Sequence, residues 1–281
     1  MRTKDGELIL TMNTPSENAI VFVVIVIILC LIGYIVYKLR DEIKNKIKER
    51  FTSTIFDDYK PDVLVYYINL DRREDRNKKL ITELQKSKII EPLYKRFSAI
   101  DGKDIILQEY TKFNKSYEEL NKKRGWIGCA ESHRELWKKC INKNKNMLIF
   151  EDDVLLKDNY DYNLQKSLKN LPDDFDIIYY NTVNYAVHIP YNSLYNRLVN
   201  KNFLLTNYLI SPKGANKILK YTTPYNPQKQ IDTYIVEMTR EKLLDAYLFK
   251  SPTIYTIQDF SNSDVQGKEN KIRTHDIHKV L

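Results

Sequence analysis

Residues 147–153 read MLIFEDD, a short apolar run that leads directly into three consecutive acids. The apolar run predicts a buried strand, and acids at the end of such a strand predict a ligand site, because open α/β sheets gather their ligands at the carboxyl ends of strands. Glu151, Asp152 and Asp153 would repel one another without a cation between them. We therefore predict that they hold a hard divalent ion, Mn²⁺ or Mg²⁺. The alternative is a loop of solvated acids that caps a helix.

Further apolar runs of strand length flank this segment and alternate with segments of helical spacing. The pattern predicts an α/β fold in which a mostly parallel central sheet carries helices on both faces. The other strands predicted in this way cover residues 63–70, 94–99, 176–181, 202–210, 246–249 and 253–257, and predicted helices follow residues 71, 211 and 230 and include residues 129–140.

The chain has 281 residues, enough for one sizeable domain beside a long apolar run. This run, AIVFVVIVIILCLIGYIVY, covers residues 19–37 without a charge and is nearly long enough as a helix to cross about 30 Å of hydrocarbon. We expect an N-terminal tail at 1–18, one transmembrane helix at 19–37, a juxtamembrane stalk at 38–60, a folded domain at 61–267 and a polar tail at 268–281. A cleaved signal peptide is the alternative to the transmembrane helix.

Basic residues flank the apolar run unequally, with Arg2 and Lys4 before it and a cluster of Lys and Arg from Lys38 to Arg50 after it. The positive-inside rule then predicts a single-pass membrane protein with its C-terminal domain in the cytosol, although the lumenal side stays open. The formal net charge of +8 suits several kinds of anionic partner. We expect no nucleic-acid partner, because the basic residues are interspersed with acids and no aromatic-basic motif is present.

A second polar cluster lies at the end of the first predicted strand and contains Asn69, Asp71, Arg72 and Arg76. The planar fork of arginine suits phosphate oxygens, and the amide groups at a helix start add a favourable dipole. These residues are therefore candidates for binding a phosphorylated cofactor or donor. An ordinary charged first helical turn explains the same residues equally well.

A third candidate site contains Ser132 and His133, which follow two glycines that permit close backbone approach. Their polar groups could face a sugar or a pyrophosphate, although a histidine on a partly apolar helix is more often packed and hydrogen-bonded. Later in the chain, Asp232, Asp259 and Asp264 could each be a base, a metal ligand or a cap. No serine with matching partners suggests a hydrolase triad.

Seven segments, in order and in register, resemble glycosyltransferase family 25, the family of lipopolysaccharide-modifying transferases and procollagen galactosyltransferases. The resemblance extends from about residue 63 to residue 266. The segments are INLDRREDR (68–76), FSAIDG (97–102), GWIGCAESH (125–133), LIFEDDV (148–154), YLISPKGA (208–215), IDTYI (231–235) and TIQDFSNSDVQ (256–266).

The resemblance implies a GT-A type nucleotide-sugar transferase fold at 61–267 and an inverting, metal-assisted hexosyltransferase. Such an enzyme moves galactose or glucose from a UDP-sugar to a hydroxyl on a glycan, a lipid-linked saccharide or a protein, usually with Mn²⁺. The family's metal motif falls on Glu151, Asp152 and Asp153, its donor motif on Asn69, Asp71, Arg72 and Arg76, and a later acid on Asp232.

The roles predicted for these residues follow from the chemistry of transfer. Asp232 is the predicted base for the acceptor hydroxyl, and Asp153 is predicted both to bind the metal and to take part in catalysis. Ser132 and His133 are assigned to the donor side. Trp126 stands where the family often has an acid, and Glu131 where it usually has a small or apolar residue, which leaves the acceptor open.

Two other functions are compatible with the sequence. A catalytically inactive, membrane-tethered carbohydrate-binding or scaffold protein would keep the fold without turnover, although an intact acidic triplet is unexpected in such a protein. A glycoside hydrolase would use two carboxylates, water as acceptor and no metal. Sensitivity to EDTA separates the hydrolase from the transferase.

Overall fold

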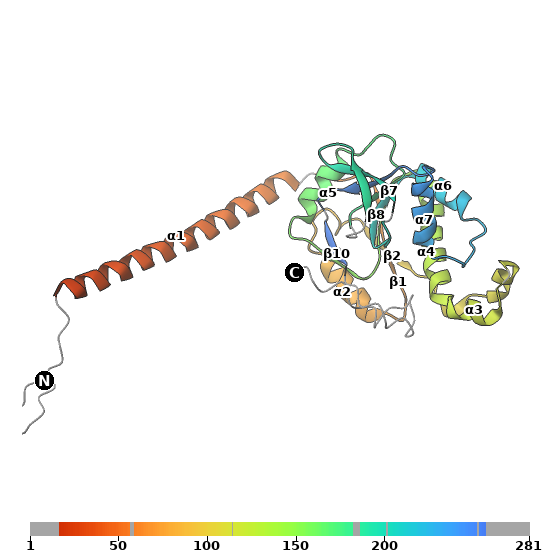
Figure 1. Cartoon of the computed structure of the whole chain (residues 1–281), viewed down its shortest axis with the longest axis horizontal. Helices are drawn as coiled ribbons and strands as arrows, with labels where there is room; N and C mark the ends of the chain where they lie inside the picture. The colour runs from red at the N-terminus through yellow and green to blue at the C-terminus, as the bar shows by residue number, and fades with distance from the viewer. Residues whose placement is uncertain are drawn as a thin grey trace, which may run out of the picture. The chain divides into compact units, whose positions relative to one another are not determined.

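The computed structural model describes residues 17–56, 59–113, 115–181, 186–200, 202–251 and 253–256 (Figure 1). The chain separates into two units between Ile55 and Phe56. Several predicted parts lie outside the described residues: Asp259, Asp264, most of the segment at 256–266, the tail at 268–281 and the tail at 1–18 apart from residues 17 and 18.

The first unit contains one helix, α1 (Glu17–Phe56), which is 40 residues long. Within it, Phe22–Lys44 is apolar and long enough to cross a membrane, and none of that stretch is buried within the protein. A signal sequence would meet the same criteria of length and composition. The residues predicted as a stalk from 38 onward continue the same helix as far as Phe56.

A sheet forms the centre of the second unit (Figure 1). It has eight strands in the order β2-β1-β3-β8-β5-β9-β7-β6. A separate antiparallel pair consists of β4 (Val154–Leu156) and β10 (Ile254–Thr256). The strands of the large sheet are β1 (Leu64–Asn69), β2 (Tyr94–Ser98), β3 (Met147–Phe150), β5 (Ile177–Tyr179), β6 (Val187–Pro190), β7 (Tyr195–Asn200), β8 (Asn207–Ile210) and β9 (Ala246–Phe249).

The sheet is mixed, so the prediction of a mostly parallel sheet is wrong. β1 is parallel to β2 and to β3, and β5 is parallel to β9. β8 is antiparallel to both of its neighbours, β3 and β5, and β7 is antiparallel to β9 and β6. The described part of the connection from β5 to β8 contains β6 and β7 and no helix, so it lacks the helical crossover that usually precedes a parallel strand.

Helices cover both faces of the sheet. Neighbouring residues of each strand point to opposite faces and therefore pack against different helices. Leu148 and Phe150 pack with α2 (Glu74–Leu84) and α5 (Tyr160–Leu168) on one face. Met147 and Ile149 belong to the core of the other face, together with residues of the remaining helices. These are α3 (Tyr117–Lys122), α4 (Arg124–Lys143), α6 (Pro212–Tyr221) and α7 (Ile231–Arg240).

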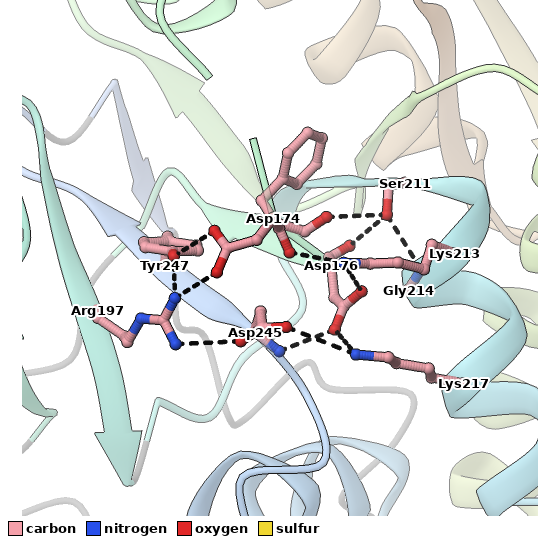
Figure 2. Close-up of polar contacts among 10 residues, drawn as sticks. Asp174, Asp176, Arg197, Ser211, Lys213, Gly214, Lys217, Asp245 and Tyr247 are labelled. Atoms are coloured by element: carbon pink, nitrogen blue, oxygen red, sulfur yellow. Dashed lines mark hydrogen bonds and ion pairs between the residues drawn. The ribbon is translucent and has the colours of Figure 1, made fainter. Parts of the chain in front are cut away.

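Ion pairs gather at the edge of the sheet where β5 and β9 begin, as Figure 2 shows. The Asp176 side chain is fully buried there, and Lys217 of α6 donates to its Oδ2 atom at 2.5 Å. Lys213 Nζ lies 3.2 Å from the Oδ1 atom of Asp176 without a hydrogen bond to it. Arg197 of β7 pairs with Asp174 and Asp245. This network, which we call the far-edge network, holds α6 and β7 against the amino ends of β5 and β9.

Candidate active site

A cleft of about 390 Å³ opens at the opposite edge of the sheet, where β1 and β3 end. Because β8 runs antiparallel to β3, the residues that precede β8 lie at this same edge. The cleft is lined by residues at or after the ends of three strands (68–70 and 72, 99–103, 151–153) and by Arg76 of α2. It is also lined by the first turns of α4 (124–126, 129, 132 and 133), by residues 204–206 before β8 and by residues 230–232 at the start of α7.

Asp153 lies in this cleft beside Glu151 and Asp152. Burial raises the pKa of the Asp153 carboxyl well above its ordinary range, and the charges of Glu151 and then Asp152 raise it further. The Oδ1 atom of Asp153 is buried, and no hydrogen-bond donor in the described part of the chain reaches it. A buried carboxylate oxygen without a partner, among like charges, is stabilised by a hard cation, so these residues fit a divalent metal ion.

Asp152, the middle acid, is held by the last residue of β1 and by a residue of α2. Asn69 Nδ2 donates to its Oδ2 atom at 2.7 Å, and Arg76 Nη1 donates to its Oδ1 atom at 2.9 Å. Burial raises the pKa of Asp152, and these two donors act in the opposite direction. The structure therefore brings two residues predicted for the donor side into direct contact with a residue predicted for the metal.

Asp232 enters the cleft from the first turn of α7. Thr233 Oγ1 donates to its Oδ1 atom at 3.3 Å, and the Leu204 amide lies 3.5 Å from its Oδ2 atom. Burial raises the pKa of Asp232, opposed by hydrogen bonds from the backbone of Leu204 and Thr233. A carboxyl group with a raised pKa in a cleft is suited to proton transfer.

Ser132 lines the cleft but is only 1% exposed. Its hydroxyl donates to the Gly128 carbonyl at 2.7 Å and accepts from the Ile100 amide at 2.8 Å. A Cβ atom on Gly128 would lie 2.6 Å from the Ile100 carbonyl oxygen, so glycine is required for this close approach. Ser132 thus fixes the segment after β2 against α4.

His133 is also 1% exposed, and both of its ring nitrogens have partners within the protein. Its Nδ1 atom lies 2.8 Å from the Tyr208 hydroxyl, and its Nε2 atom lies 3.1 Å from Glu151 Oε1. Ligand atoms of Cys129, His133 and Glu151 all lie within 4.8 Å of one another, an arrangement that could hold a metal ion. His133 therefore touches the acidic triplet directly.

Of the two remaining predicted residues, Asp71 and Arg72, only one lies in the cleft. Asp71 does not line the cleft, and its side chain is 73% exposed. A hydrogen bond from Ser98 and then one from Arg96 lower the pKa of Asp71. Arg72 does line the cleft, where its Nε atom pairs with Asp101 at 2.6 Å.

Several residues of the cleft were not singled out from the sequence. Asp101 was given no role, although it stands in the segment at 97–102 that resembles the family. Residues 204–206 carry no chemical signal and reach the cleft only because β8 is reversed. Basic and amide side chains complete this group, which includes Lys103, Arg124 and Gln230.

The mixed sheet with helices on both faces defines an α/β protein. The acids clustered in the cleft at the strand ends form a site suited to a cation and an anionic ligand. The chain belongs to glycosyltransferase family 25. The family profile, described as "Glycosyltransferase family 25 (LPS biosynthesis protein)", matches residues 63–235, which is more than half of the chain.

Three relatives illustrate the similarity. Procollagen galactosyltransferase 2 of Homo sapiens is 27% identical over 190 residues, which are 62% of this chain and 30% of that protein. Procollagen lysyl hydroxylase and glycosyltransferase of Acanthamoeba polyphaga mimivirus is 26% identical over 179 residues, 55% of this chain and 19% of that protein. A glycosyltransferase 25 family member of Aedes aegypti is 25% identical over 253 residues, 77% of this chain and 40% of that protein. The matched regions thus span less than half of these relatives' lengths.

Proposed function

We propose that this chain is a hexosyltransferase of the GT-A type. It moves galactose or glucose from a UDP-sugar to an acceptor hydroxyl on a glycan, a lipid-linked saccharide or a protein, with inversion at the anomeric carbon. Membership of family 25 and the names of the relatives support glycosyl transfer. The observation that carries the proposal is the buried Oδ1 atom of Asp153, which lacks a partner among the described residues and lies in a cleft beside two further acids.

Glu151, Asp152 and Asp153 are the residues that would hold the metal, Mn²⁺ or Mg²⁺. When bound, the ion supplies positive charge that offsets the charge developing on the departing nucleotide diphosphate. Asp153 contributes the oxygen without a partner, whereas both oxygens of Asp152 already accept hydrogen bonds. Arg72 and Lys103 line the same cleft and add positive charge where the diphosphate would lie.

Asp232 is the proposed base. Its raised pKa makes the carboxylate a better proton acceptor than an exposed aspartate would be. An inverting displacement places the acceptor and the leaving group on opposite sides of the anomeric carbon, so the base must come from outside the metal cluster. Asp232 meets this condition because α7, rather than the end of β3, carries it into the cleft.

The proposal includes the division of the chain predicted above, with a transferase domain at 61–267 and a single transmembrane helix at 19–37. The apolar stretch of α1 supports a membrane anchor. The basic residues from Lys38 onward favour a cytosolic position for the transferase domain.

A donor screen tests this function. The full chain in detergent would be given UDP-, GDP- and CMP-sugars with Mn²⁺ or with EDTA, and release of the nucleotide would be measured. We expect turnover of UDP-galactose or UDP-glucose only with Mn²⁺. We also expect a loss of at least about 100-fold for Asp153→Asn, which removes a charge that stabilises the metal. The matched control is Asp158→Asn, a change at an exposed acid outside the cleft, which should keep full activity.

Other outcomes would contradict the proposal in distinguishable ways. Full activity in EDTA, or full activity of Asp153→Asn, would show that the reaction does not require the metal. Cleavage of a glycoside by water without metal would identify a hydrolase. Binding of a glycan without turnover of any donor would identify an inactive carbohydrate-binding protein.

A further inference from the structure

A buried chain of hydrogen bonds connects the core of the second unit to the acidic triplet through Trp137, Tyr208 and His133. We infer that His133 is a positioning residue. As a neutral imidazole that carries its proton on Nε2, it donates to Glu151 and holds that carboxylate toward the proposed metal site. The role of Glu151 rests on the proposed function, whereas the order of the hydrogen bonds does not.

The first link in the chain has only one possible direction. The indole nitrogen of Trp137 is a donor and never an acceptor, and it lies 2.9 Å from the Tyr208 hydroxyl oxygen. The Tyr208 oxygen therefore accepts from Trp137, and its own hydrogen must point elsewhere. Both side chains are completely buried, so bulk water does not compete for this hydrogen.

The second link follows from the first. Among the described residues, the acceptor available to the Tyr208 hydroxyl is His133 Nδ1, at 2.8 Å. A ring nitrogen that accepts a hydrogen bond carries no proton, so the proton of the neutral ring lies on Nε2. The Nε2 atom faces Glu151 Oε1 at 3.1 Å and donates to it. Each donor in this series of hydrogen bonds then has an acceptor, as buried polar groups require.

This order of bonds fixes Glu151 in a particular way. One carboxylate oxygen is occupied by His133, while the side chain remains 27% exposed at the cleft. On this inference, the other oxygen is left to bind the proposed metal ion together with Asp152 and Asp153. Residues that hydrogen-bond a metal-binding carboxylate commonly strengthen metal binding by fixing its orientation.

The same order opposes a metal ion held by Cys129, His133 and Glu151, although their ligand atoms lie close together. Coordination by Nε2 would move the ring proton to Nδ1, and a doubly protonated ring would also carry a proton there. The Tyr208 oxygen would then receive hydrogens from both Trp137 and His133. Its own hydroxyl hydrogen would be left in the interior without an acceptor among the described residues, which is unfavourable.

Two measurements on the full chain test the inference. ¹⁵N NMR of histidine-labelled protein, with His133→Gln used to assign the signal, reports which ring nitrogen carries the proton, and we expect Nε2. Titration with Mn²⁺, followed by electron paramagnetic resonance without donor or acceptor, reports metal affinity. We expect Tyr208→Phe to raise the dissociation constant for Mn²⁺ by about 10- to 100-fold.

Tyr180→Phe is the matched control. Tyr180 is equally buried and loses the same hydroxyl, but that hydroxyl bonds to Ser167 in the core on the other face of the sheet. We expect it to lower the melting temperature as Tyr208→Phe does and to leave Mn²⁺ affinity unchanged. His133→Gln, whose amide can still donate toward Glu151, should bind Mn²⁺ more tightly than His133→Phe.

A proton on Nδ1 in the wild-type ring would overturn the inference. Wild-type Mn²⁺ affinity in a folded Tyr208→Phe, or loss of Mn²⁺ binding in Cys129→Ser, would also overturn it. If the wild-type chain bound no Mn²⁺, the metal component of the proposed function would fail, and the position of the ring proton would still decide the order of hydrogen bonds.

Discussion

At Asp153, the stability of the folded protein and the proposed binding of a metal ion oppose each other. Its pKa is raised by burial and then by the charges of Glu151 and Asp152, so the folded protein favours the protonated carboxyl. That contribution to stability is fully present below the pKa of the unfolded chain, about 3.9, and is lost as the pH rises toward the folded pKa. At neutral pH and without a cation, the ionised form of Asp153 therefore lowers the free energy of unfolding.

We accordingly expect Asp153→Asn to raise the melting temperature of the metal-free protein, and to do so more at pH 7 than at pH 5. The variant should gain nothing from added Mn²⁺, whereas the wild type should be stabilised, and more strongly as the pH rises and Asp153 loses its proton. Thermal unfolding in EDTA and in Mn²⁺ at both pH values measures this, with Asp158→Asn as the control. A variant that melts below the wild type in EDTA would refute the account.

The three acids of this site can be predicted from the sequence, but the different hydrogen-bond partner of each acid cannot. Glu151, Asp152 and Asp153 are adjacent in the chain, so their proximity needs no folding. Their differences come from partners elsewhere: Asn69 and Arg76 hold Asp152, and His133 holds Glu151. Such pairing depends on which strands are neighbours, and local residue patterns do not encode that.

At the scale of secondary structure, α6 is joined to the sheet by its lysines in the far-edge network (Figure 2). Asp176 has no exposed side-chain surface, while the Lys217 side chain is 34% exposed and donates to it. Loss of one partner leaves a buried charge with less compensation. Because solvent screens part of the interaction, we expect Lys217→Met to lower the free energy of unfolding by about 1–3 kcal/mol.

Urea unfolding of the full chain, followed by tryptophan fluorescence, measures this loss, since both tryptophans, Trp126 and Trp137, lie in the second unit. Lys213→Met is the matched control. The Lys213 side chain is 52% exposed and makes no hydrogen bond to the Asp176 carboxylate, so its loss should cost less. Equal losses in the two variants would show that the hydrogen bond from Lys217 stabilises the fold no more than the contact from Lys213 does.

Most of the strands that sequence patterns predicted correctly are buried or nearly continuous in apolar character; β2 is the exception, with exposed residues at Lys95, Arg96 and Ser98. β3, β8 and β9 are buried throughout, and each lies within a predicted apolar run, although the run at 202–210 forms a strand only at Asn207–Ile210. β6 was missed because all of its residues are exposed. β7 and β4 were also missed, and each of them contains both buried and exposed residues. The prediction of a mostly parallel sheet did not foresee the reversed direction of β8, since strand direction depends on the connection before the strand and not on its own residues.

Over the whole molecule, α1 allows a direct test of membrane attachment. We expect the full chain to remain in the membrane fraction after extraction with alkaline carbonate and to keep residues 19–37, because a continuous apolar helix is not displaced by high pH. Sequencing of the N-terminus and treatment of intact vesicles with protease would measure retention and sidedness. A released protein whose N-terminus follows residue 37 would show that the segment is a signal peptide.

The reversed course of β8 has a consequence for how related chains can diverge. The chain reaches the cleft through residues 202–206 before the hydrogen-bonded ladder of β8 begins. Insertions or deletions in that approach would reshape one wall while leaving every strand register intact, whereas the same changes inside β3 would displace the acids themselves. Changes in this one connection can therefore alter the shape of the cleft during evolution without displacing the residues proposed for the chemistry.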